Sequence, residues 1–321
     1  MNKNTFPVID GHVDTFLKVI EQNRKFSERS EIGHCDLIRM KEGNVQAALF
    51  AIESGYTIES LLRNIDIWFE TVSNPDNGLI QIKKLDDFDK VRDSKKLGAI
   101  LHFEGATGID ESLKLLRIGY HLGLRSMGLT WSNVNKFGTG VRVTTKHQRK
   151  TGLTDMGRDL VRKAQTLGIT IDVSHLNDRS FWDLYEITER PIIASHSNAR
   201  SVCNHPRNLT DDQIKVINEK HGTIGINFCL NFLDPKRLGG NNFDLGLDAI
   251  QKHIDHIAEI TDINTIAIGS DFDGATVPTC VRDCTKFPDL WDYLLENGYS
   301  NQDLKKIAYE NLFRVFKSTW K

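Results

Sequence analysis

The sequence predicts an α/β protein, a (β/α)₈ TIM-type barrel formed by residues 1–321 as a single domain. Short apolar runs, typical of parallel strands buried on both faces, alternate with amphipathic helical segments along the whole chain. A minimal barrel of eight such units has roughly 250 residues. The chain has 321, which leaves room for two long connections. An open doubly wound sheet is the alternative, but no glycine-rich phosphate loop follows the first apolar run.

Each expected strand is a run rich in Ile, Val, Ala and Leu that ends in polar residues. The expected strands cover residues 8–14, 45–53, 98–104, 124–131, 169–175, 192–196, 223–228 and 266–271.

The clearest helix covers residues 153–168, with Thr154 as its N-cap and Gly168 at its end. Thr210 and Ser300 are expected to cap similar helices over 211–220 and 301–316, each with acidic residues in the first turn. The two long connections, at 132–152 and 229–243, are interpreted as functional loops over the site.

Composition excludes several classes of protein. The chain is 39% hydrophobic, and its 41 basic and 43 acidic residues give a net charge of −2 without a basic stripe, so we expect no nucleic-acid partner. No apolar run reaches the roughly 20 residues of a membrane span, and no secretory signal or lipid anchor is evident. The five cysteines show no disulfide pattern. We therefore expect a cytoplasmic protein without a membrane anchor; a homodimer is left open.

Residues that can bind metal ions collect at the carboxyl ends of the expected strands, where barrel enzymes place their active sites. They are His12, Asp14, Glu104, His175, His196 and Asp271. Imidazole nitrogen and carboxylate oxygen are usual ligands of ions such as Zn²⁺. Three imidazoles and three carboxylates are more than one catalytic ion needs, and they suit two ions that share a carboxylate.

Other interpretations compete at single positions. A histidine at a strand end is often a core residue, and an aspartate there often caps the next helix. His102 points to the same side as Glu104 and is the strongest competing candidate for a ligand. Asp273 competes with Asp271 in the same way, and Cys280 and Cys284 form only a weak C-x-x-x-C pattern.

Five segments together resemble the metal-binding and substrate-binding segments of the membrane dipeptidase (renal dipeptidase) family. They are VIDGHVDTF, HFEGATG, DVSHLN, SHSNARSVCNHPRNLTDDQ and IGSDFDG, and the resemblance runs in order from about residue 6 to residue 320. It implies a (β/α)₈ barrel with two zinc ions that hydrolyses dipeptides, often tolerating a D-residue at the carboxyl-terminal position. The chain is most similar to the soluble bacterial members.

Carried over by position, the resemblance makes His12 and Asp14 ligands of one zinc ion and His175 and His196 ligands of the other. Glu104 would bridge both ions. The fourth expected strand contains no lysine, so a modified lysine, the bridge of some related barrels, is not available.

The same resemblance assigns the remaining site residues. Asp271 would handle protons beside the attacking water, and Arg207 would bind the free carboxylate of the substrate. Trp131 stands where mammalian relatives have a substrate-contacting histidine, and an indole can only donate a hydrogen bond. Asn133, or Asn135, would supply part of the missing contact.

The expected function is therefore hydrolysis of small free dipeptides by a hydroxide that bridges two zinc ions. A two-metal barrel hydrolase of another small amide, lactone or phosphoester is the nearest alternative, and a catalytically silent metal-binding protein is a second. Arg207 discriminates against a lactone, because a neutral lactone offers a guanidinium nothing to bind.

Overall fold

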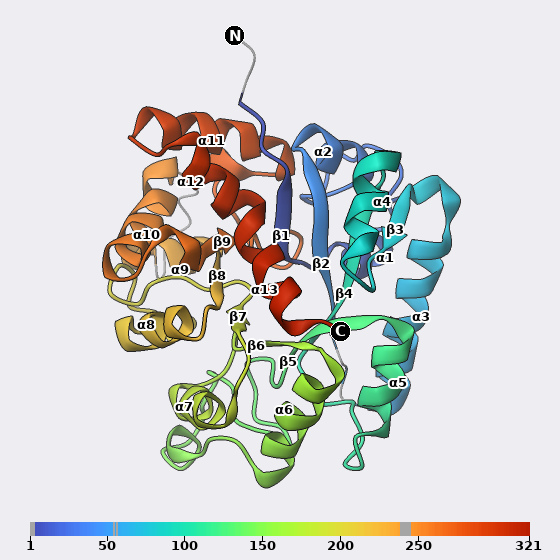
Figure 1. The fold of residues 1–321 in the computed structure, drawn as a ribbon, viewed down its shortest axis with the longest axis vertical. Helices are drawn as coiled ribbons and strands as arrows, with labels where there is room; N and C mark the ends of the chain where they lie inside the picture. The colour runs from blue at the N-terminus through green and yellow to red at the C-terminus, as the bar shows by residue number, and fades with distance from the viewer. Residues whose placement is uncertain (1–3, 54, 56, 238–244) are drawn as a thin grey trace.

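The computed structural model describes residues 4–53, 55, 57–237 and 245–321. In this part of the chain, eight parallel strands close into a barrel in the order β1–β2–β4–β5–β6–β7–β8–β9, and helices surround it (Figure 1). The barrel strands are β1 (Val8–Val13), β2 (Val45–Glu53), β4 (Leu97–Glu104), β5 (Leu124–Gly128), β6 (Thr170–Asp172), β7 (Ile192–Ala194), β8 (Thr223–Ile226) and β9 (Ile266–Ile268). The predicted fold class is confirmed.

The sequence did not predict the short strand β3 (Leu79–Gln81). It pairs with the beginning of β4, with Leu79 opposite Leu97, while β5 pairs with β4 only from Leu101 onward. Three residues are too few for a recognisable strand pattern, so β3 depends on the edge that β4 offers.

Helices occupy the connections between the strands, and all three predicted N-caps are confirmed. The hydroxyls of Thr154, Thr210 and Ser300 each accept a hydrogen bond from a backbone N–H in the first turn of the helix that follows. The helices are α1 (Thr15–Glu21), α2 (Leu37–Glu42), α3 (Ile58–Ser73), α4 (Asp86–Ser94), α5 (Lys114–Leu122), α6 (Asp155–Leu167), α7 (Asp178–Ile187), α8 (Asp211–Glu219), α9 (Leu230–Leu233), α10 (Leu247–Ile260), α11 (Phe287–Glu296), α12 (Asn301–Lys305) and α13 (Asn311–Thr319). The single helix expected over 301–316 is instead α12 and α13, joined by a wide π-helical turn at Lys306–Glu310.

Several strands end earlier than predicted. The expected ends at 131, 175, 196 and 271 lie two or three residues beyond the ends of β5, β6, β7 and β9. His175 and Asp271 have φ angles of +71° and +62°, a left-handed conformation that extended strands do not adopt. These residues therefore lie in the loops just past the strands.

The amino end of the barrel is closed by α13, which crosses in front of the central strands in Figure 1. One buried cluster joins residues from α13 and the end of the chain to strand residues. It includes Leu312, Val315, Phe316, Trp320, Ile9, Leu49, Ile100, Ile193 and Ala267. The carboxyl end remains free to form a cavity.

The two long connections differ in how much of them the structure describes. Residues 132–152 are described; they contain a 3₁₀ turn, Gln148–Lys150, and an isolated bridge between Gly140 and Leu176. In the second connection, predicted at 229–243, residues 238–243 lie outside the described residues, and 229–237 contain α9. None of the described helices combines the length and the apolar character needed to span a membrane.

Candidate metal centre and active site

Glu104, the last residue of β4, lies at the centre of the candidate site. Its Oε1 atom is 3.6 Å from Nε2 of His12, 3.0 Å from Nε2 of His175 and 3.7 Å from Nε2 of His196. One carboxylate oxygen therefore faces three imidazole nitrogens that come from three different strands or strand ends.

Metal-ligating atoms of the six predicted residues converge in three overlapping groups, each with its atoms within 4.8 Å of one another. The groups are His12–Asp14–Glu104, Glu104–His175–His196 and His12–His196–Asp271. The first two groups share Glu104, so the structure brings together the residues that the sequence assigned to two ions with a common carboxylate. Their role as ligands stays a prediction.

The surroundings of His12 favour a positive charge on or beside its ring. Its ring is fully buried, and neither ring nitrogen makes a hydrogen bond within the described residues. Nε2 lies 3.5 Å from Oδ2 of Asp14. Burial disfavours the charged imidazole, but the charges of Asp14 and Glu104 outweigh it and raise the pKa of His12 to about 10. The site thus favours positive charge at this point, as a cation site should.

His175 and His196 approach one another closely through their Nε2 atoms, which are 3.0 Å apart. Two imidazole nitrogens at this distance require a proton or a metal ion between them. Burial lowers the pKa of both residues well below the usual range, and the charge of Arg207 lowers both further. Neutral imidazoles with buried, converging nitrogens fit the donor set of a zinc site.

Serine hydroxyls hold the far side of these two rings. Ser132 Oγ lies 2.9 Å from Nδ1 of His175, and Ser195 Oγ lies 2.7 Å from Nδ1 of His196. Ser195 in turn donates to Asp172 Oδ2 at 2.6 Å. These contacts were not predicted from the sequence, although the adjacent Ser195 and His196 in the SHS segment were a signal for one of them.

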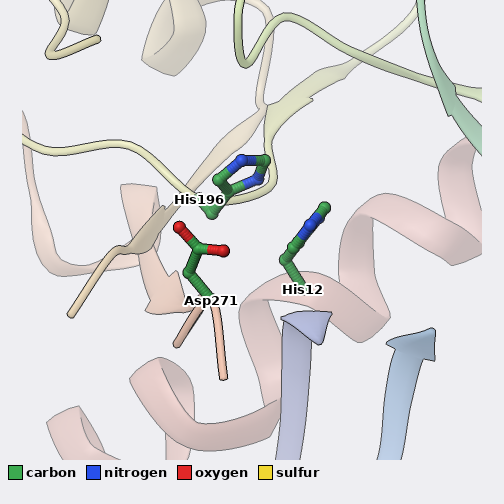
Figure 2. A group of neighbouring side chains, drawn as sticks. All are labelled: His12, His196 and Asp271. Atoms are coloured by element: carbon green, nitrogen blue, oxygen red, sulfur yellow. The ribbon is translucent and has the colours of Figure 1, made fainter. Parts of the chain in front are cut away.

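Asp271 faces the space between His12 and His196, as Figure 2 shows. Its left-handed backbone turns the side chain into the site, and Asn227 Nδ2 donates to its Oδ2 at 2.9 Å. Burial raises the pKa of Asp271 to about 6, against the opposing effect of His12. A carboxyl with this pKa can accept and release a proton near neutral pH.

The competing residues Asp273 and His102 are engaged elsewhere. Asp273 accepts hydrogen bonds from Thr15 Oγ1 at 2.8 Å and from Arg24 Nη2 at 3.0 Å. His102 Nδ1 lies 3.0 Å from Ser126 Oγ, and its ring belongs to none of the candidate metal groups found among the described residues. The cysteines at 280 and 284 are free and also contribute to no such group.

Asp14 precedes α1 at the N-cap position, but its side chain makes no cap hydrogen bond. The carboxylate instead packs against Gly274, where an added Cβ would lie 2.0 Å from Asp14 Oδ2 and 2.6 Å from Asp271 Oδ1. Gly274 is therefore needed for these two carboxylates to approach the same point.

A cavity of about 1070 Å³ opens over the candidate metal-binding residues at the carboxyl end of the barrel. Arg207 lines it and is only 6% exposed, with Nη2 donating to the carbonyl oxygen of His196 at 3.2 Å. Its guanidinium carbon lies 5.5 Å from the ring centre of Phe232. Burial lowers the pKa of Arg207. A buried guanidinium beside the candidate metal-binding residues can bind an anionic group.

Trp131 lines both this cavity and a smaller one of about 280 Å³, as do Glu53 and Glu104. Its ring centre is 5.8 Å from that of His175. Asn133 lines only the smaller cavity. Asn135 Oδ1 accepts hydrogen bonds from the backbone N–H groups of Phe137 and Gly138, so its amide holds the loop.

A family model described as membrane dipeptidase, peptidase family M19, matches residues 3–321. Among relatives, an uncharacterised protein encoded in the pqqA 5′ region of Klebsiella pneumoniae is 38% identical, covering 73% of this chain and 86% of the relative. An uncharacterised dipeptidase of Schizosaccharomyces pombe is 31% identical, covering 98% of this chain and 81% of the relative.

A solved structure shows the same fold. A metallopeptidase from Rhodobacter sphaeroides, crystallised with a phosphinate mimic of the dipeptide L-Ala-D-Ala, superposes with a TM-score of 0.89 at 30% identity. The match covers 99% of this chain and 100% of that one.

Proposed function

The chain belongs to the membrane dipeptidase family, peptidase family M19, and is a metallo-dipeptidase; from this premise we propose that it uses two zinc ions to hydrolyse free dipeptides. The substrates would include dipeptides with a D-residue at the carboxyl terminus. One observation carries the proposal: a single oxygen of Glu104 lies within 3.0–3.7 Å of three imidazole nitrogens.

The donor set fits zinc rather than a hard ion such as Mg²⁺, because three of the six candidate ligand residues are histidines. His12 and Asp14 would hold one ion, His175 and His196 the other, and Glu104 both. Zinc at such a site supplies a water activated for attack at neutral pH and polarises the scissile carbonyl.

The remaining chemistry belongs to side chains of the protein. Arg207 would bind the free carboxylate of the substrate, which fixes the scissile bond one residue before the carboxyl terminus. Asp271 would accept the proton of the attacking water and deliver it to the leaving amine, because its carboxylate faces the space between His12 and His196. Asn227 keeps one oxygen of Asp271 occupied and thereby orients the other.

Trp131 would form one wall of the substrate site, because it lines the cavity beside His175. Asn133 lines the smaller cavity, so we propose that it contacts only the part of a substrate that extends past Trp131.

The proposal is tested with zinc-loaded enzyme and four sets of substrates: L,L-dipeptides, L,D-dipeptides, their carboxyl-terminal amides, and tripeptides. We expect hydrolysis of dipeptides of both kinds and little turnover of amides or tripeptides. Equal kcat/KM for a dipeptide and its amide would show that Arg207 does not anchor the substrate. Preferential hydrolysis of a small lactone would point to the alternative hydrolase function.

A further inference from the structure

Two buried aspartates lie behind the candidate metal centre and belong to none of the candidate metal groups among the described residues. Asp10 in β1 and Asp172 in β6 are each 1% exposed, and neither pairs with a lysine or arginine in the described chain. Asp172 accepts from the backbone N–H of Ser195 at 2.8 Å and from its hydroxyl at 2.6 Å. Asp10 accepts from the same two groups of Ser270 at 2.9 and 2.6 Å. The two aspartate–serine pairs have the same geometry.

The pairs differ in what the serine oxygen contacts next. Ser195 precedes His196, and its Oγ lies 2.7 Å from Nδ1 of that ring. Ser270 precedes Asp271, and the described structure records no imidazole contact for its Oγ. This oxygen instead accepts from the backbone N–H of Phe272 at 3.2 Å and lies 3.4 Å from the carbonyl oxygen of His12. Only the Asp172–Ser195 pair is therefore connected to a candidate metal ligand.

The hydrogen atoms in the series of hydrogen bonds from Asp172 through Ser195 to His196 can be assigned by counting donors and acceptors. A serine hydroxyl carries one hydrogen and a carboxylate carries none, and Ser195 Oγ lies 2.6 Å from Asp172 Oδ2 but 3.4 Å from Ser174 Oγ, so Ser195 donates its hydrogen to Asp172. Its oxygen can then only accept from His196, which places a hydrogen on Nδ1. Nε2 is left with a lone pair and no hydrogen, and this is the atom that lies 3.0 Å from Nε2 of His175 and 3.7 Å from Glu104 Oε1.

We propose that Ser195, oriented by Asp172, is a positioning residue that fixes the tautomer and ring orientation of His196 so that Nε2 can bind the metal ion. The inference rests on the proposed function for the role of His196 as a ligand. A hydrogen bond to the far nitrogen of a ligating imidazole commonly changes metal affinity by about 10- to 100-fold.

The backbone at this position is held independently of the hydroxyl. The carbonyl oxygen of Ser195 lies at the barrel centre, where an added Cβ would be 1.9 Å from it on Gly269, 2.1 Å on Gly225 and 2.7 Å on Gly11. Because this close packing does not involve the hydroxyl, Ser195→Ala should keep the backbone in place while it removes the contact to His196.

The test compares three variants of the full chain. Ser195→Ala removes the acceptor for His196. Asp172→Asn keeps the shape but presents an amide N–H to the serine, which frees the serine hydrogen to donate to Nδ1 and should reverse the tautomer. Ser270→Ala is the matched control, since it removes the same hydrogen bond to a buried aspartate without touching an imidazole.

Zinc affinity is measured by competition with a chromophoric chelator, and the tautomer by NMR of ¹⁵N-histidine-labelled protein without metal. We expect affinity to fall about 10- to 100-fold in Ser195→Ala and Asp172→Asn and to stay within about threefold in Ser270→Ala. In Asp172→Asn, the hydrogen of His196 should move from Nδ1 to Nε2.

Equal loss of affinity in Ser195→Ala and Ser270→Ala would overturn the proposal, as would wild-type affinity with an unchanged tautomer in Asp172→Asn. If Ser195→Ala does not fold, Asp172→Asn decides the question alone. The NMR measurement needs neither metal nor substrate, so it separates this inference from failure of the proposed function.

Discussion

The candidate metal centre has two halves, His12 with Asp14 and His175 with His196, and the structure positions them in different ways. His12 lies within strand β1, fully buried, with its ring centre 3.8 Å from that of His196 and 5.4 Å from that of His102. His175 and His196 lie past the ends of β6 and β7, and each has a serine hydroxyl against Nδ1. Packing and strand geometry hold the first candidate ligand, whereas hydrogen bonds hold the other two.

The difference shows what a ligand needs when it leaves a regular element. A strand fixes the direction of each side chain, so a packed imidazole within it needs no further support. A loop residue such as His175, at φ +71°, has no such constraint and depends on side-chain contacts for its orientation. Variants that remove these contacts should therefore affect the β6–β7 half alone.

The largest effect should come from Glu104→Gln, which replaces the carboxylate that the two halves share. A neutral amide offers one oxygen and no charge, so we expect both metal ions to be bound weakly and kcat/KM to fall at least ~1000-fold. Metal analysis and dipeptide kinetics check this. Glu21→Gln is the control, because Glu21 lines the same cavity but belongs to none of the candidate metal groups among the described residues. Retention of both ions in Glu104→Gln would show that the two halves do not depend on a shared carboxylate.

Asp271→Asn should have the next largest effect, and it sharpens the comparison because Asp271 faces one imidazole from each half. The variant keeps the size of the side chain and removes the proton-accepting charge. We expect near-complete metal content with kcat reduced at least ~100-fold. Normal turnover with full metal would mean that another group carries the proton.

Arg207→Lys should act on the substrate and leave both halves intact. An ammonium cannot reproduce the two-pronged contact of a guanidinium with a carboxylate, so kcat/KM for dipeptides should fall about 10- to 100-fold. The slow hydrolysis of dipeptide amides should change little, because they lack the carboxylate. Steady-state kinetics with matched pairs of dipeptide and amide measure the ratio. A parallel loss for both substrates would instead indicate damage to the metal centre.

Ser132→Ala should produce the smallest effect, because the variant loses a contact to His175 alone. Loss of the 2.9 Å contact should weaken zinc binding by about tenfold, the lower end of the range for such support, because Ser132 is only half-buried. Ser126→Ala is a matched control with the same serine–imidazole contact, at 3.0 Å, to His102. Chelator competition should detect the loss in the first variant only. Equal losses in both would show that His102 also supports the metal.

The sequence predicted the barrel because buried parallel strands are continuous apolar runs, and the polar residues that follow these runs mark the strand ends only to within two or three residues. It predicted which residues would meet, since the carboxyl ends of all strands in a closed barrel face one cavity. It could not predict that β6, β7 and β9 stop early, because positive φ angles at His175 and Asp271 leave no apolar pattern. Nor could it predict contacts between elements far apart in the chain, such as Ser132 with His175 or Asn227 with Asp271.

The central claim is that two zinc ions share Glu104 and that both are needed for dipeptide hydrolysis. The most direct test reloads metal-free enzyme stepwise with zinc while elemental analysis and dipeptidase activity are measured in the same samples. We expect full activity only as the zinc content approaches two ions per chain. Full activity at one tightly bound ion per chain would contradict the claim.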